Sequence, residues 1–267
     1  MITPWLLGDP PLVSDRPRLF CFPHAGGGAS AFSPWLRRGS RLDVQPVRLP
    51  GRESRIAEPP VRSMDALLDL LVPALVPFLD GSFSLLGHSA GAAVAFALAR
   101  RLEENGRVPV RLFVSGCAPP SSRGRARSIH RLTAEEIAGV LRGLGGTPQA
   151  VLDDPDALAL FLPAIRADFE LYETWHGDSG ALLSCPVSAY YGTADPGCDA
   201  EQARAWGSVT TGSSTCRGFP GGHHFLFGSS SGDVLRSVAE EVGHELSTRS
   251  RVERDRRPGC RCGDRKD

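Results

Sequence analysis

Apolar segments of strand length alternate along this chain with segments of helical periodicity. The expected strands are residues 19–22, 44–49, 83–86, 110–114 and 186–191. The expected helices are residues 64–79, 92–104 and 233–246. Because parallel strands need long crossover connections, usually helices, this alternation predicts an α/β fold. We expect a mainly parallel sheet flanked by helices on both faces.

The alternation breaks between residues 120 and 184, where several helices are expected and no strand. Thr133 has the spacing of a capping box with Glu136 and begins one helix. Asp154 caps a second helix, with Pro155 in its first turn, and Pro163 is expected to begin a third. A helical insertion of this kind suits a lid over an active site. The alternative is a set of helices that only adds to the core.

The chain has 267 residues, of which 41% are apolar. We expect residues 1–248 to form one domain, with residues 120–184 as the inserted lid. Residues 249–267 are polar and rich in charge, which predicts a flexible tail. Cys260 and Cys262 in this tail lack a second ligand pair at a suitable spacing, so we expect no metal site.

The net charge and the cysteine content restrict the classes of binding partner and the cellular compartment that we expect for this protein. The formal net charge is zero, so no overall electrostatic bias favours nucleic acid or an anionic membrane. The first residues lack a secretory signal, and the most apolar window is too short to span a bilayer. Seven scattered cysteines fit reduced thiols better than a disulfide framework. We therefore expect a cytoplasmic location.

Ser89 lies in a Gly-x-Ser-x-Gly sequence between an expected strand and an expected helix. A serine at such a strand-to-helix elbow adopts a strained turn and needs small residues two positions before and after it, as Gly87 and Gly91 are. The N–H of Ala90 lies at the positive end of the following helix, where it can stabilise an oxyanion. We predict that Ser89 is a nucleophile, the alternative being a turn that simply begins a helix.

A serine hydroxyl needs an imidazole to accept its proton and a third group to orient that imidazole. His223 and His224 lie in a glycine-rich loop before the last expected helix, where this kind of fold carries its base. We choose His223 because the preceding glycines let the loop reach the elbow. His224 remains the alternative, and His88 is expected to pack or hydrogen-bond.

The orienting acid should follow a late strand and precede the histidine in the chain. Asp195 does so directly after the strand at residues 186–191. Asp199 is the nearest competitor, but it is placed to cap the next helix. The chain order Ser89, Asp195, His223 is that of the α/β-hydrolase fold.

A glycine-rich loop follows the first strand, and Ala25 within it could donate a second oxyanion-hole N–H. Gly26, Gly28 and Ala31 also match a loose dinucleotide-binding fingerprint, which would predict an oxidoreductase. That interpretation needs an acid at the end of the second strand, whereas Asp43 lies at the start of that strand.

With these residues in place, the chain resembles the type II thioesterases of polyketide and nonribosomal peptide synthesis from about Phe20 to Leu246. Two positions depart from that family, which usually has Met where Ala90 stands and Phe where His224 stands. The matching segments are residues 21–27, 49–53, 87–89, 145–148, 162–168 and 221–223.

The resemblance implies an editing enzyme that hydrolyses stalled or mis-primed acyl groups from the phosphopantetheine arm of acyl or peptidyl carrier proteins. It implies no cofactor of the enzyme's own. A general carboxylesterase or a medium-chain acyl thioesterase of the same fold remains an alternative. As a weaker hypothesis, arginines near the lid could attract an acidic carrier protein. They are Arg123, Arg125, Arg127 and Arg131.

Overall fold

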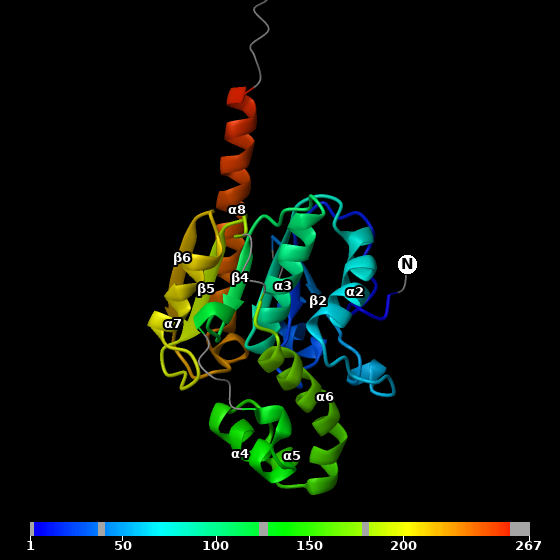
Figure 1. The fold of residues 1–267 in the computed structure, drawn as a ribbon. Coiled ribbons are helices and arrows are strands. Elements are labelled where there is room, and N and C mark those ends of the chain that lie inside the picture. Colours follow the sequence, from blue (N-terminus) through cyan, green and yellow to red (C-terminus); the bar gives the residue numbers. More distant parts are fainter. Residues whose placement is uncertain (1–2, 37–40, 123–127, 178–181, 257–267) are drawn as a thin grey trace, which may run out of the picture.

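The computed structural model describes residues 3–36, 41–122, 128–177 and 182–256. Its centre is a six-stranded parallel sheet in the order β2-β1-β3-β4-β5-β6 (Figure 1). The strands are β1 (Arg18–Phe22), β2 (Asp43–Pro46), β3 (Phe83–His88), β4 (Leu112–Ser115), β5 (Val187–Gly192) and β6 (Ser214–Phe219). This arrangement confirms the expected fold class. The strand order reverses between β1 and β3, where α/β sheets form a crevice at their carboxyl edge.

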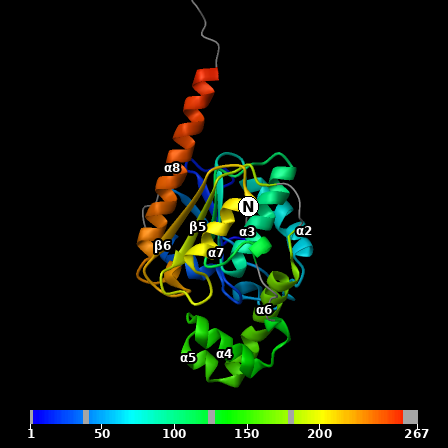
Figure 2. The same ribbon diagram turned by 60° about the vertical axis from the view of Figure 1, so that its left-hand side comes forward.

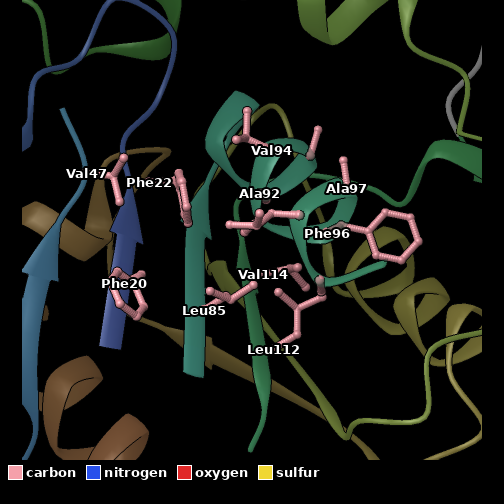
Figure 3. Packing of buried hydrophobic residues seen from close by; sticks show 14 of the residues in the cluster. Phe20, Phe22, Val47, Leu85, Ala92, Val94, Phe96, Ala97, Leu112 and Val114 are labelled. Atoms are coloured by element: carbon pink, nitrogen blue, oxygen red, sulfur yellow. The ribbon is translucent and has the colours of Figure 1, made fainter. Parts of the chain in front are cut away.

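Helices cover both faces of the sheet because successive side chains of each strand point to opposite sides. Phe20 and Phe22 of β1 pack in one apolar cluster, shown in Figure 3, and Leu19 and Cys21 pack in another. The helices of the first cluster are α2 (Met64–Leu75), α3 (Ala90–Glu104) and α7 (Ala200–Arg204), and those of the second are α1 (Ser33–Leu36) and α8 (Ser231–Arg256). The buried face of α3 contains several alanines, so this helix packs closely against the strands. This close packing fixes the position of the α3 N-terminus.

The expected insertion lies between β4 and β5 and contains α4 (Ala134–Leu144), α5 (Gln149–Leu152) and α6 (Pro155–Thr174). The three helices extend below the body of the domain in both views (Figures 1 and 2). Thr133 forms the expected capping box with Glu136, and Asp154 caps α6 by accepting hydrogen bonds from two backbone N–H groups.

One expectation for the insertion is wrong. Pro163 does not begin a third helix but lies inside the 20-residue α6. An interior proline removes one backbone hydrogen bond and usually breaks a helix. Here Leu158 and Ile165, on either side of Pro163, are both buried, so packing holds the two halves of α6 in one helix.

The C-terminal part of the chain also differs from expectation. Helix α8 continues to Arg256, so the tail expected from residue 249 is helical over its first eight residues. The end of α8 projects from the body on the side away from α4 and α5 (Figures 1 and 2). Residues 257–267, with Cys260 and Cys262, lie outside the described residues. Within the described part of the chain, no helix is both long and apolar enough to cross a bilayer.

Candidate active site

Ser89 occupies a sharp turn between β3 and α3. Its backbone has φ 55° and ψ −122°, a strained conformation for a residue other than glycine. A Cβ atom on Gly87 would collide with the backbone of Gly91, and a Cβ on Gly91 would collide with the carbonyls of Phe22 and Pro23. The turn therefore needs glycine at both positions, as the motif predicts.

The structure brings Ser89, His223 and Asp195 together. His223 Nε2 lies 3.0 Å from Ser89 Oγ. His223 Nδ1 lies 2.9 Å and 3.1 Å from the two carboxylate oxygens of Asp195. A carboxylate can only accept, so Nδ1 carries the proton and Nε2 is free to accept from the serine hydroxyl. The Asp195 side chain is fully buried, which holds this relay out of water.

Backbone hydrogen bonds hold the loops after β5 and β6 beside each other. Thr193 donates to the Phe219 carbonyl and Ala194 donates to the Gly221 carbonyl, both at 2.9 Å. A Cβ on Gly192 would lie 2.7 Å from the Gly221 oxygen, so the close approach requires glycine there. The paired loops place Asp195 against His223 although 28 residues separate them.

The competing residues have other partners. Asp199 caps α7 by accepting from the Gln202 N–H at 2.8 Å. The His224 ring packs edge-on against His24 with centroids 4.5 Å apart. His88 is fully buried, and its Nδ1 lies 3.0 Å from Ser115 Oγ, as expected of a residue that packs and hydrogen-bonds.

Two backbone N–H groups near Ser89 are expected to form the oxyanion hole. Ala90 is the first residue of α3, so its N–H has no acceptor within the helix. Ala25 lies in the loop after β1, which pairs with β3 at the carboxyl edge. Among the described residues, that loop leads to a short 3₁₀ helix (Ala29–Phe32) and the four-residue α1, and not to a long helix of the kind whose N-terminus binds a pyrophosphate. Within the described residues, no group of three or more metal-ligating side chains could hold a metal ion.

A cavity of about 250 Å³ lies between the glycine-rich loop and the inserted helices. Most of its lining is apolar. The residues that line it are His24, Ala25, Gly26, Leu141, Gly146, Thr147, Pro148, Val151, Leu158, Phe161 and Ile165. Ala25, which lines the cavity, belongs to the same apolar cluster as Ala90 and the helices of the insertion, so this cluster connects the cavity walls to the residue after Ser89.

A family model described as the thioesterase domain matches residues 17–245. The chain belongs to the thioesterase domain family. It is 34% identical over 230 residues to the gramicidin S biosynthesis protein GrsT of Aneurinibacillus migulanus, covering 85% of this chain and 90% of the relative. It is 35% identical over 216 residues to the medium-chain S-acyl fatty acid synthase thioesterase of Rattus norvegicus, covering 78% and 81%.

Solved structures agree with this assignment. The type II thioesterase BorB from the borrelidin biosynthetic cluster superposes with a TM-score of 0.81 at 37% identity, covering 89% of this chain and 97% of that structure. The resemblance to type II thioesterases and the expected enzyme class are therefore confirmed. The oxidoreductase interpretation is not supported.

Three further imidazoles surround His223 in this thioesterase. Burial, followed by the neighbouring His224, His223 and Arg52, lowers the pKa of His24 to about 3. Burial and then His223 lower the pKa of His224 to about 4. The pKa of the buried His88 is also well below its ordinary value. These rings stay neutral near pH 7, so they add no positive charge that would oppose protonation of the base.

The sequence motifs did not reveal what Arg52 and Asp168 do. Both lie in segments that match the type II thioesterases, yet 116 residues separate them and no local pattern links them. In the structure they form a buried ion pair beside Gly26 and Gly27. Among the arginines of the weaker hypothesis, Arg131 is exposed, and Arg123, Arg125 and Arg127 lie outside the described residues.

Proposed function

We propose that this protein hydrolyses acyl thioesters carried on the phosphopantetheine arm of acyl or peptidyl carrier proteins and so removes stalled or mis-primed acyl groups. The observation that carries the proposal is the Ser89, His223 and Asp195 relay beside an apolar cavity. Two similar proteins support the proposed substrate class. One is named for gramicidin S biosynthesis, and the other is a type II thioesterase from the borrelidin biosynthetic cluster.

The first half of the reaction transfers the acyl group to the enzyme. Ser89 Oγ attacks the thioester carbon while His223 Nε2 accepts the hydroxyl proton. The N–H groups of Ala25 and Ala90 stabilise the oxyanion of the tetrahedral intermediate. When the intermediate collapses, the C–S bond breaks and His223 returns the proton to the thiol. A thiol of pKa about 8.5 is a good leaving group, so this step needs no metal ion.

The second half releases the acid. His223, again neutral, accepts a proton from water while the water oxygen attacks the acyl-Ser89 ester. The new intermediate uses the same N–H groups, and its collapse returns the proton to Ser89 Oγ. Asp195 holds Nδ1 protonated throughout and stabilises the imidazolium that forms twice in each cycle.

The cavity can account for recognition of the acyl chain. Its walls combine the glycine-rich loop with α4, α5 and α6, so an acyl group on Ser89 can extend into an apolar space under the insertion. The phosphopantetheine arm would approach from outside the insertion. We propose that residues 120–184 act as a lid in this way.

The test compares wild type with Ser89→Ala on three substrates that carry the same acyl group. The group is presented on a carrier protein, on free pantetheine thiol and as an oxygen ester. We expect the highest kcat/KM for the carrier-bound thioester and a loss of several orders of magnitude in Ser89→Ala. Equal rates on thioester and oxygen ester would favour a general carboxylesterase. An Ser89→Ala variant with wild-type turnover would exclude the mechanism.

The relative from Rattus norvegicus supports a second candidate, because its name specifies medium-chain acyl groups. A series of carrier-bound acyl groups of increasing length separates the two functions. A preference for acetyl and other short groups supports editing, whereas a sharp optimum at medium length supports chain release.

A further inference from the structure

A buried ion pair joins the inserted helix α6 to the turn that follows β2. Arg52 donates from Nη1 to Asp168 Oδ2 at 2.6 Å and from Nη2 to Asp168 Oδ1 at 2.8 Å. Arg52 is 4% exposed and Asp168 is 7% exposed. Burying two charges is costly unless their geometry is good and their remaining hydrogen-bonding capacity is used. The other hydrogen-bond partners of Arg52 and Asp168 therefore indicate what this ion pair stabilises.

Those partners belong to the glycine-rich loop. Asp168 Oδ2 also accepts from the Gly26 N–H at 2.7 Å, and Arg52 Nη1 also donates to the Gly27 carbonyl at 3.0 Å. The ion pair thus binds one donor and one acceptor of the loop at the two residues directly after Ala25. Gly26 has φ +72°, and its position lies against Ile165 of α6, so no larger residue fits there.

Glu53 holds the other end of the same loop. Its Oε1 accepts from the Ser30 N–H at 2.8 Å, and its Oε2 lies 3.1 Å from Arg48 Nε. Glu53 is one of two residues other than glycine in the described chain with positive φ, the other being Ser89. The strained backbone at Glu53 directs adjacent side chains, those of Arg52 and Glu53, to opposite ends of one loop.

We propose that Arg52, Glu53 and Asp168 form a loop clamp that positions the Ala25 N–H for the oxyanion and makes this position depend on α6. The clamp residues touch neither the reacting atoms nor the relay, so they are positioning residues. The inference rests on the proposed function, in which Ala25 donates to the oxyanion. Because Asp168 is on the inserted helix, displacement of α6 withdraws the acceptor of the Gly26 N–H, and Ala25 loses its fixed position. The oxyanion hole is then complete only when the lid is in place.

Asp168→Asn is the most direct test. Asparagine keeps the size of the side chain but loses the negative charge, and its NH₂ group replaces one of the two oxygens that now accept from Arg52 and the Gly26 N–H. At least one of these donors then faces another donor. Arg52→Lys is the companion variant, because it keeps the charge but loses the two-pronged contact and the Gly27 contact. We expect kcat to fall about 10-fold to 100-fold in both, since a small misplacement of an oxyanion donor has this effect. KM should change less than about twofold.

Glu170→Gln is the matched control. Glu170 lies on the same helix as Asp168 and also pairs with an arginine outside the insertion, Arg62, but this pair is more exposed and is not hydrogen-bonded to the glycine-rich loop. It should keep kcat within about twofold of wild type because exposed ion pairs contribute little. A similar loss in Glu170→Gln would mean that any ion pair between α6 and the rest of the domain affects turnover, and the assignment to the loop would be wrong.

Two further measurements separate positioning from folding and from substrate choice. Thermal unfolding and circular dichroism give the folded fraction of each variant, and a loss of kcat that only matches the unfolded fraction overturns the proposal. The rate at which a fluorophosphonate labels Ser89 depends on the oxyanion hole and needs no carrier protein. It should fall in Asp168→Asn and Arg52→Lys even if the wild type proves inactive on carrier-bound thioesters. Folded variants with wild-type kcat and labelling rate would overturn the clamp.

Discussion

Acidification should destabilise this protein through the imidazoles that surround the base, and His224 allows the effect to be isolated. Burial and then His223 lower the pKa of His224 from 6.5 to about 4. In the unfolded chain the same ring titrates near its ordinary value. Between these two pKa values the unfolded state binds a proton that the folded state does not. Stability therefore rises with pH in this window and falls as the pH is lowered through it.

The magnitude follows from the shift. Going from about pH 8 to about pH 5, a ring with these two pKa values would cost about 2 kcal/mol of folding free energy. His224 keeps some solvent contact, so about 1 kcal/mol is a better expectation. His24, with a pKa of about 3, adds a further loss of the same sign.

The assay is urea unfolding of wild type and His224→Phe at a series of pH values. Phenylalanine fits the aromatic surroundings of His24 and Phe227 and cannot be protonated. The variant should lose about 1 kcal/mol less than wild type on acidification. His244→Phe, at an exposed position of α8, is the control and should keep the wild-type pH dependence. An unchanged pH dependence in His224→Phe would mean that protonation of His224 does not cause the loss of stability.

Three other perturbations test separate parts of the account. Asp195→Asn should lower kcat by about 10⁴-fold, as loss of the orienting carboxylate does in other triads; a fall below tenfold in carrier-thioester assays would contradict its role. Gly91→Ala should cost about 1–3 kcal/mol in thermal unfolding because the added Cβ meets backbone carbonyls of Phe22 and Pro23. Gly243→Ala, with open space around it on α8, should not destabilise, and equal losses in the two variants would argue against the steric cause. Thr133→Ala removes the capping box of α4 and should cost about 1 kcal/mol, seen as faster amide exchange in α4 than in wild type while α3 keeps its protection.

The sequence predicted catalytic residues best where both the residue type and its position relative to the expected strands and helices matched a catalytic role. Ser89 and Asp195 each follow a predicted strand, and the carboxyl ends of parallel strands meet at one edge, so their proximity could be predicted. His223 was placed beside them because its glycine-rich loop precedes the last expected helix. Choosing His223 over His224 depended on how far a glycine loop reaches, and the structure gives His223 the contacts with Ser89 and Asp195.

Other features had no usable local signal. Strand β6 was not predicted because it lies at the sheet edge and its residues, largely polar and exposed, form no apolar run. Pro163 was misassigned because a proline suits the first turn of a helix, and only tertiary packing allows it inside α6. The polar composition after residue 249 predicted a flexible chain, but extending an existing helix costs much less than starting one.

The pairing of Arg52 with Asp168 illustrates a more general limit. Each residue belongs to a segment that matches the type II thioesterases. The structural role of each follows only from its contacts, which join Arg52 to Asp168 and Asp168 to the Gly26 N–H. Contacts between distant segments become visible only when the inserted helices are placed against the glycine-rich loop.

In the proposed mechanism the acyl group passes through a covalent bond to Ser89, and intact-protein mass spectrometry detects that acyl-enzyme. Wild type mixed with an acyl-carrier protein and quenched with acid within the first turnover should gain the mass of one acyl group, and peptide mapping should locate it on Ser89. Ser89→Ala should gain none. Acylation of another residue, or hydrolysis by Ser89→Ala at the wild-type rate, would mean that Ser89 is not the nucleophile.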